Sequence, residues 1–222
     1  MNGPWPWVTL ALLGAYHGLN PGMGWLFAVA RGLQDQRREA VLRSLLPIAL
    51  GHAASIALVV ALVGGAQTLA APGPVRAVGA VVLILFGVFK LLRPRSHPHW
   101  VGMRIGAGEL ALWSFLMATA HGAGLMLFPV LLALPAAPQG THLEGAHAHA
   151  HGASAIGGGP ASLGQDAAAV LVHTLAMLLV MGAVALVVYE KVGLAVLRRA
   201  WINLDLIWAV AIVAAGAFTL FT

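Results

Sequence analysis

Four histidines, His17, His52, His121 and His173, fall inside long apolar segments of the sequence. An ionisable side chain at membrane depth is costly, so its presence there favours a functional role. Neutral imidazole is the commonest metal-ligand side chain and suits Zn, Cu, Fe and Ni. Four imidazoles could close a tetrahedral shell, whereas two or three would leave a position for exchange. The alternative is structural, because histidines can also hydrogen-bond between the helices of a membrane bundle.

The segment that follows His17 predicts a broken helix. It reads Asn20-Pro21-Gly22-Met23, in the middle of an apolar run. A helix broken at membrane depth is tolerated only where protein or a water-lined cavity covers the freed backbone. Asn20 and Met23 could add an amide oxygen and a thioether to a metal site, and unwound carbonyls can also coordinate a cation. Met23 could instead fill space in the core.

A second group of histidines lies in residues 135–166, a stretch rich in Gly, Ala, Pro and His. His147, His149 and His151 alternate with alanine there. Histidine tracts of this composition are typical of metal binding. We therefore predict these three as further metal ligands, in a loop that could gather or receive ions. A polar spacer is the alternative.

Composition indicates a polytopic membrane protein. The 222 residues are 60% hydrophobic and 9% charged, whereas a soluble domain carries about 25% charged residues. The absence of cysteine excludes disulfides and thiolate metal sites. The net charge of +5 comes from the loops, and no motif indicates binding of nucleic acid.

Hydropathy predicts an all-α fold with six transmembrane helices, since a spanning helix needs about 20 mostly apolar residues. We place the spans at residues 5–30, 45–64, 75–92, 110–134, 167–189 and 201–221. Eleven of the 12 lysines and arginines fall in the first, third and fifth loops, and only Arg76 lies on the other side. By the positive-inside rule these loops are cytoplasmic, so both termini are extracytoplasmic.

The two halves of the chain carry similar motifs in the same order. These are His17-Gly18, His52 and Gly87-Val88-Phe89, then His121-Gly122, His173 and Gly216-Ala217-Phe218. Because each half has an odd number of spans, the second copy would be inverted, a recognised plan for transporters. We expect one membrane domain, 1–222, with repeats at 1–93 and 107–222. The first helix should be broken, and a break in the fourth helix is left open. Chance recurrence of short apolar words is the alternative.

Residues 14–24 resemble the first-span motif of the NicO-type nickel/cobalt exporters, in the LysE-like superfamily. The family motif runs roughly His-Ala-Leu-Glu-Pro-Gly-His-Gly, and the segment around His52 resembles its second-span histidine. The resemblance implies a six-span exporter of a metal or small solute, and it carries over His17, Pro21, Gly22 and His52 directly. Asn20 and Met23 replace a glutamate and a histidine of the motif, which would weaken, soften or abolish a Ni/Co site. The resemblance covers the first hundred residues well and the rest loosely.

These observations favour a transporter over an enzyme. We expect export of a transition-metal cation of the Ni/Co/Zn/Cu class by alternating access, with the ion as substrate and no organic cofactor. The alternatives are an exporter of amino acids or other organic solutes, and a haem-binding membrane redox protein with paired axial histidines. Membrane lipid and a metal ion are the expected partners, and a homodimer is left open. The alanine- and glycine-rich composition and the resemblance favour the bacterial inner membrane.

Overall fold

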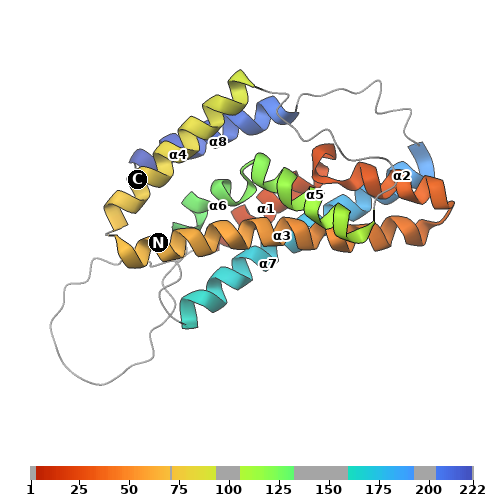
Figure 1. The fold of residues 1–222 in the computed structure, drawn as a ribbon, viewed down its shortest axis with the longest axis horizontal. Helices are drawn as coiled ribbons and strands as arrows, with labels where there is room; N and C mark the ends of the chain where they lie inside the picture. Colours follow the sequence, from red (N-terminus) through yellow and green to blue (C-terminus); the bar gives the residue numbers. More distant parts are fainter. Residues whose placement is uncertain (1–3, 71, 94–105, 133–159, 193–203, 222) are drawn as a thin grey trace.

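The computed structural model describes residues 4–70, 72–93, 106–132, 160–192 and 204–221, and these contain helices and no strand (Figure 1). The elements are α1 (Trp5–Leu19), the 3₁₀ turn η1 (Pro21–Met23), α2 (Trp25–Asp35), α3 (Arg38–Leu69), α4 (Pro72–Leu92), α5 (Ala107–Ala120), α6 (Ala123–Leu132), α7 (Pro160–Val187), the π turn η2 (Val188–Val192) and α8 (Leu204–Phe221). The all-α prediction is confirmed for this part of the chain. Each predicted span overlaps one helix or one broken helix.

Several helices are long and apolar enough to cross a membrane. Three meet that condition alone, over Arg38–Ala66, Gly73–Leu92 and Leu163–Lys191. The pair α5 and α6, bent by 59°, makes a fourth if it is counted as one span. In α8 the apolar stretch is shorter, Ala209–Leu220, and α1 has 15 residues. A membrane protein is thus supported with three to four candidate spans among the described residues.

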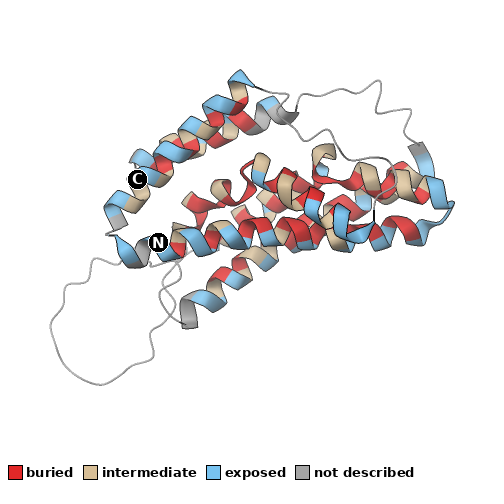
Figure 2. Ribbon diagram, in the orientation of Figure 1, coloured by how far each residue is buried: buried red, intermediate tan, exposed pale blue. Residues whose placement is uncertain are grey.

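The outside of the bundle is apolar, unlike the surface of a soluble protein. Large apolar side chains cover the outside of the bundle: Leu12, Leu62 and Leu179 are 65%, 63% and 73% exposed. His52 and His173 are among the polar side chains buried in the interior. Figure 2 shows the buried residues, in red, mainly where the helices pack on one another. An apolar exterior of this extent would associate in water, but it suits a lipid environment.

The predicted break after His17 is confirmed, and its backbone groups are satisfied by the protein itself. The Asn20 side chain accepts a hydrogen bond from Gly22 N at 2.9 Å, and the Trp25 indole donates to the carbonyl of Leu19 at 3.2 Å. Gly24, at φ 119°, then turns the chain into α2. This φ is open to glycine and strained for other residues, so the break has a defined geometry.

A second break interrupts the fourth predicted span. Helix α5 ends at Ala120, and α6 begins at Ala123 after Gly122, whose φ is 69°. Pro129 lies inside α6 and does not cause the break. The sequence left a break in this helix open, and the structure contains one. It falls at the pair His121-Gly122, and the first break likewise lies close to the pair His17-Gly18.

Two pairs of helices pack closely and in parallel. Gly14 and Gly18 of α1 face α7, where a Cβ on Gly14 would collide with the carbonyl of His173. In the other pair, Ser114 of α5 donates a hydrogen bond to the carbonyl of Ile48 in α3 at 2.7 Å. Small residues let the backbones of membrane helices approach in this way, and each pair joins one half of the chain to the other.

Helices α4 and α8 lie side by side along one edge of the bundle (Figure 1). A Cβ on Gly87 would lie 3.0 Å from the backbone nitrogen of Val213, and a Cβ on Gly216 would lie 3.0 Å from the carbonyl of Ala80. Gly87 thus packs against the backbone of α8, and Gly216 packs against the backbone of α4.

We expect Gly87→Ala and Gly216→Ala to destabilise the protein by similar amounts, about 1–3 kcal/mol, because each methyl group would force the same two backbones apart. Thermal unfolding in detergent would measure this. The matched control is Gly73→Ala in α4, where a Cβ would meet nothing within 4 Å. Equal melting temperatures for all three variants would contradict the close packing of α4 on α8.

Candidate metal centre

Three buried histidines from three helices converge in the interior. His17 lies in the last turn of α1, His52 in α3 and His173 in α7, with exposed fractions of 1%, 1% and 0%. One ring nitrogen from each lies within 4.8 Å of those from the other two. The sequence predicted these three side chains as ligands, and the structure brings them together.

Backbone carbonyls orient two of the three rings. His17 Nδ1 lies 2.9 Å from the carbonyl oxygen of Leu13, and His173 Nδ1 lies 3.2 Å from that of Leu10. A carbonyl can only accept, so Nδ1 carries the proton in both rings and Nε2 carries the lone pair. Metal-binding histidines typically donate their other ring N–H to a carbonyl in this way.

The distance between His52 and His173 matches two ligands of one ion. Their Nε2 atoms are 3.4 Å apart, and two nitrogens of a tetrahedral zinc shell lie about 3.3–3.4 Å apart when each Zn–N bond is about 2.0–2.1 Å. Without an ion, His52 would donate its Nε2 proton to His173. With an ion, His52 would adopt the other tautomer and present a lone pair.

The His17 ring stands across the other two. It makes interplanar angles of 69° with His52 and 73° with His173, with centroids 5.1 and 4.9 Å away. The planes of His52 and His173 differ by only 5°. A small closure of His17 would therefore complete a three-nitrogen site from a direction different from that of the other two rings.

His121, the fourth predicted ligand of the apolar segments, is not part of this cluster. It caps the end of α5, and its Nδ1 lies 2.8 Å from the carbonyl oxygen of Met117. Its side chain is buried, and its Nε2 lies 3.8 Å from the place that a Cβ on Gly22 would occupy. His121 therefore sits beside the break that follows α1.

Asn20 and Met23 are buried at the same break, with exposed fractions of 3% and 2%. The Asn20 side-chain oxygen caps η1 through its hydrogen bond from Gly22, a structural task that the sequence did not reveal. Ligation by Asn20 or Met23 stays a prediction. His147, His149 and His151 lie outside the described residues, and their predicted role as ligands stays a prediction too.

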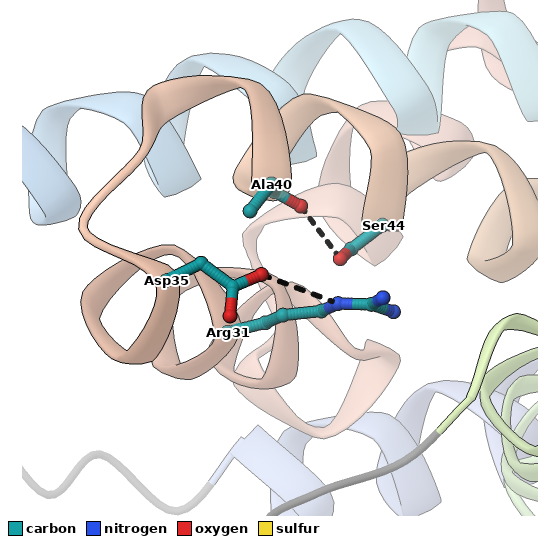
Figure 3. Close-up of polar contacts among 4 residues, drawn as sticks. All are labelled: Arg31, Asp35, Ala40 and Ser44. Atoms are coloured by element: carbon teal, nitrogen blue, oxygen red, sulfur yellow. Dashed lines mark hydrogen bonds and ion pairs between the residues drawn. The ribbon is translucent and has the colours of Figure 1, made fainter.

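A separate polar cluster occupies the junction of α2 and α3. Arg31 pairs with Asp35 at 4.0 Å on α2, and Ser44 of α3 donates to the carbonyl of Ala40 at 2.7 Å (Figure 3). Arg43 pairs with Glu39 at 3.1 Å. Together with Arg37, the charged side chains and Ala40 line a cavity of about 350 Å³. Carboxylates here are engaged with arginines, which leaves the histidine cluster as the better candidate for a cation.

Sequence reasoning missed the carbonyls that orient the rings. Leu13 precedes His17 by four positions, as Met117 precedes His121. That spacing could have indicated the contact, because a polar side chain on a helix can hydrogen-bond to the carbonyl four residues earlier. The contact from His173 to Leu10 joins α7 to α1 and has no local signal.

Comparison of the chain with protein-family models, with curated proteins and with solved structures gives no match.

Proposed function

We propose that this protein is a membrane transporter of a transition-metal cation, which His17, His52 and His173 bind in the interior of the bundle. The observation that carries the proposal is the convergence of three buried imidazoles from three helices, with ring nitrogens within 4.8 Å of one another. Buried polar side chains are costly unless they are paired or coordinate a metal. Carbonyls already pair with Nδ1 of His17 and His173, and a bound cation would be held by the Nε2 atoms.

The donor set favours borderline metals over hard ones. Imidazole nitrogens suit Zn, Ni, Co and Cu, whereas Mg²⁺ and Ca²⁺ prefer oxygen ligands. Three protein ligands would leave a fourth position open, which is how exchangeable zinc sites differ from structural ones. The expected substrates are therefore Ni²⁺, Co²⁺, Zn²⁺ or a copper ion, and not Mg²⁺ or Ca²⁺.

The helix packing supports a six-span inverted repeat. If the halves are related, α1 corresponds to α5, α3 to α7 and α4 to α8. The relation then requires α1 to pack on α7 as α5 packs on α3, and Gly87 and Gly216 to occupy equivalent contacts between α4 and α8. The described contacts have this form. The helices that carry His17 and His121, α1 and α5, correspond to each other in the two halves under this relation. Each of them ends at a break.

A site between two repeats suits alternating access, in which one repeat rocks against the other around the bound ion. The breaks at Gly24 and Gly122 supply places where the chain can change direction. The distribution of lysine and arginine supports extracytoplasmic termini. The resemblance of residues 14–24 to NicO-type exporters supports export across a bacterial inner membrane.

A haem protein fits the same histidines less well. Axial ligands lie on opposite faces of a porphyrin, so the macrocycle must pass between them. The His17 ring, with its centroid 5.1 Å from that of His52 and 4.9 Å from that of His173, occupies space beside the pair that the macrocycle would need. We therefore expect the purified protein to show no Soret absorption band.

Transport by proteoliposomes tests the proposal. We expect vesicles containing the wild-type protein to take up at least one of Ni²⁺, Co²⁺, Zn²⁺ or Cu⁺ faster than empty vesicles, as read by metal-sensitive dyes, because the site offers three imidazoles. Uptake of Mg²⁺ and Ca²⁺ should equal that of empty vesicles. Rates equal to the background for all four transition metals would contradict the proposal and favour the organic-solute alternative.

A further inference from the structure

We propose that His121 is a second station for the transported ion, which takes the place of His17 when the transporter changes conformation. The inference rests on the proposed function and adds a pathway to it. His52 and His173 would stay with the ion throughout, and His17 and His121 would bind it in turn. The third ligand would therefore be His17 of α1 in one conformation and His121 of α5 in the other.

His17 and His121 are equivalent in their local structure. Each lies where a helix ends at a break, and each is followed by a glycine. The Nδ1 atoms lie 2.9 and 2.8 Å from the carbonyl oxygens four residues earlier, those of Leu13 and Met117. Both rings are thus held with Nδ1 protonated and Nε2 as the ligand atom.

His121 lies beside the chain segment that follows the helix of His17. Its Cε1 and Nε2 atoms lie 3.8 Å from the place of a Cβ on Gly22, so the ring lies against the turn that follows α1. The other broken helix thus carries a buried imidazole beside the turn that follows His17.

The pairing of helices explains why the other two histidines can be shared. His17 lies on α1, which packs on the α7 helix of His173, and His121 ends α5, which packs on the α3 helix of His52. Exchange of the two halves would turn the group His17, His52 and His173 into His121, His173 and His52. The central pair is unchanged by that exchange, and only the third ligand differs.

Glycines at the two breaks make such an exchange mechanically feasible. Gly24 and Gly122 are the two glycines with positive φ among the described residues. Hinges are typically a few positions that absorb a change of backbone angle. A change at Gly122 would reorient α6 relative to α5, and His121 lies at the end of α5, where that change would begin.

Two matched variants test the inference, His17→Asn and His121→Asn. Asparagine keeps a donor close to the position of imidazole Nδ1 and removes Nε2, so each variant retains its carbonyl contact while losing its ligand atom. We expect His17→Asn to lose the metal ion retained by the purified protein. His121→Asn should retain one ion per chain, with an affinity within about threefold of wild type. Its transport rate in vesicles should fall at least about tenfold, because the variant would lack a ligand only in the conformation in which His121 binds the ion.

The outcomes separate the two proposals. A wild-type protein that transports none of the four metals contradicts the proposed function itself. A wild type that transports, together with His121→Asn at the wild-type rate, overturns the second station and leaves the first site intact. Loss of metal retention in His121→Asn, and likewise in His121→Gln if the asparagine variant unfolds, would also overturn it, because His121 would then belong to the first site or to the fold.

Discussion

Replacement of His173 by asparagine should abolish retention of a transition metal and leave the protein folded. Asparagine can still donate to the carbonyl of Leu10, as His173 Nδ1 does at 3.2 Å, but it has no atom in the place of Nε2. Loss of an outer-shell partner already lowers metal affinity by about 10- to 100-fold, so loss of a direct ligand should exceed about 100-fold. Calorimetric titration with Zn²⁺ and Ni²⁺ would measure the affinity.

The control for this variant is His173→Leu, which removes the ligand and the donor together. We expect it to lose both metal affinity and thermal stability, whereas His173→Asn should melt close to the wild-type temperature. A His173→Asn protein that binds Zn²⁺ and Ni²⁺ as tightly as wild type would show that the buried cluster is structural. Metal bound by such a protein would then have to lie elsewhere.

Replacement of Gly14 by leucine should have the largest effect on the fold. The space that its side chain would need is occupied by the backbone carbonyl of His173 in α7. Overpacking of a filled core costs about 1–3 kcal/mol and more where backbone atoms must move, so we expect a loss of about 3 kcal/mol or failure to accumulate. His173 sits at this contact, and any protein that folds should also lose metal affinity.

The matched control for Gly14→Leu is Gly164→Leu in α7, where a Cβ would meet nothing within 4 Å. This control should express, melt and bind metal as the wild type does, because a surface substitution usually changes stability by no more than about 0.5 kcal/mol. Gly14→Leu with wild-type melting temperature and metal affinity would contradict the close approach of α1 and α7, and with it the geometry of the site.

The all-helical class and the positions of the apolar helices were readable in the sequence because a membrane imposes length and polarity on each helix. Proline and glycine after His17 located the first break, at η1. The helix ends were less predictable: the second span was expected at 45–64, whereas α3 runs over Arg38–Leu69 with Pro47 inside it. The first turns of α3 carry charged residues, so hydropathy does not count them as part of a span. The helix nevertheless includes them and begins before the apolar region.

The composition of the histidine cluster was predictable only in part. Burial in apolar segments selected His17, His52, His121 and His173, and three of them meet. Which three depends on how α1, α3 and α7 rotate and pack, which no local pattern encodes. The sequence did not reveal that the Asn20 amide oxygen caps η1, a local contact that such side chains often make with backbone groups; its role as a ligand stays a prediction.

The most direct test of the metal centre is an X-ray absorption spectrum of the purified protein loaded with Zn²⁺ or Ni²⁺, beside the triple variant His17→Asn/His52→Asn/His173→Asn. The geometry of the cluster predicts a first shell with three imidazole nitrogens, at about 2.0–2.1 Å for zinc, and no bound metal in the triple variant. A shell without imidazole, or the same spectrum from both proteins, would contradict a transition-metal site at the three buried histidines.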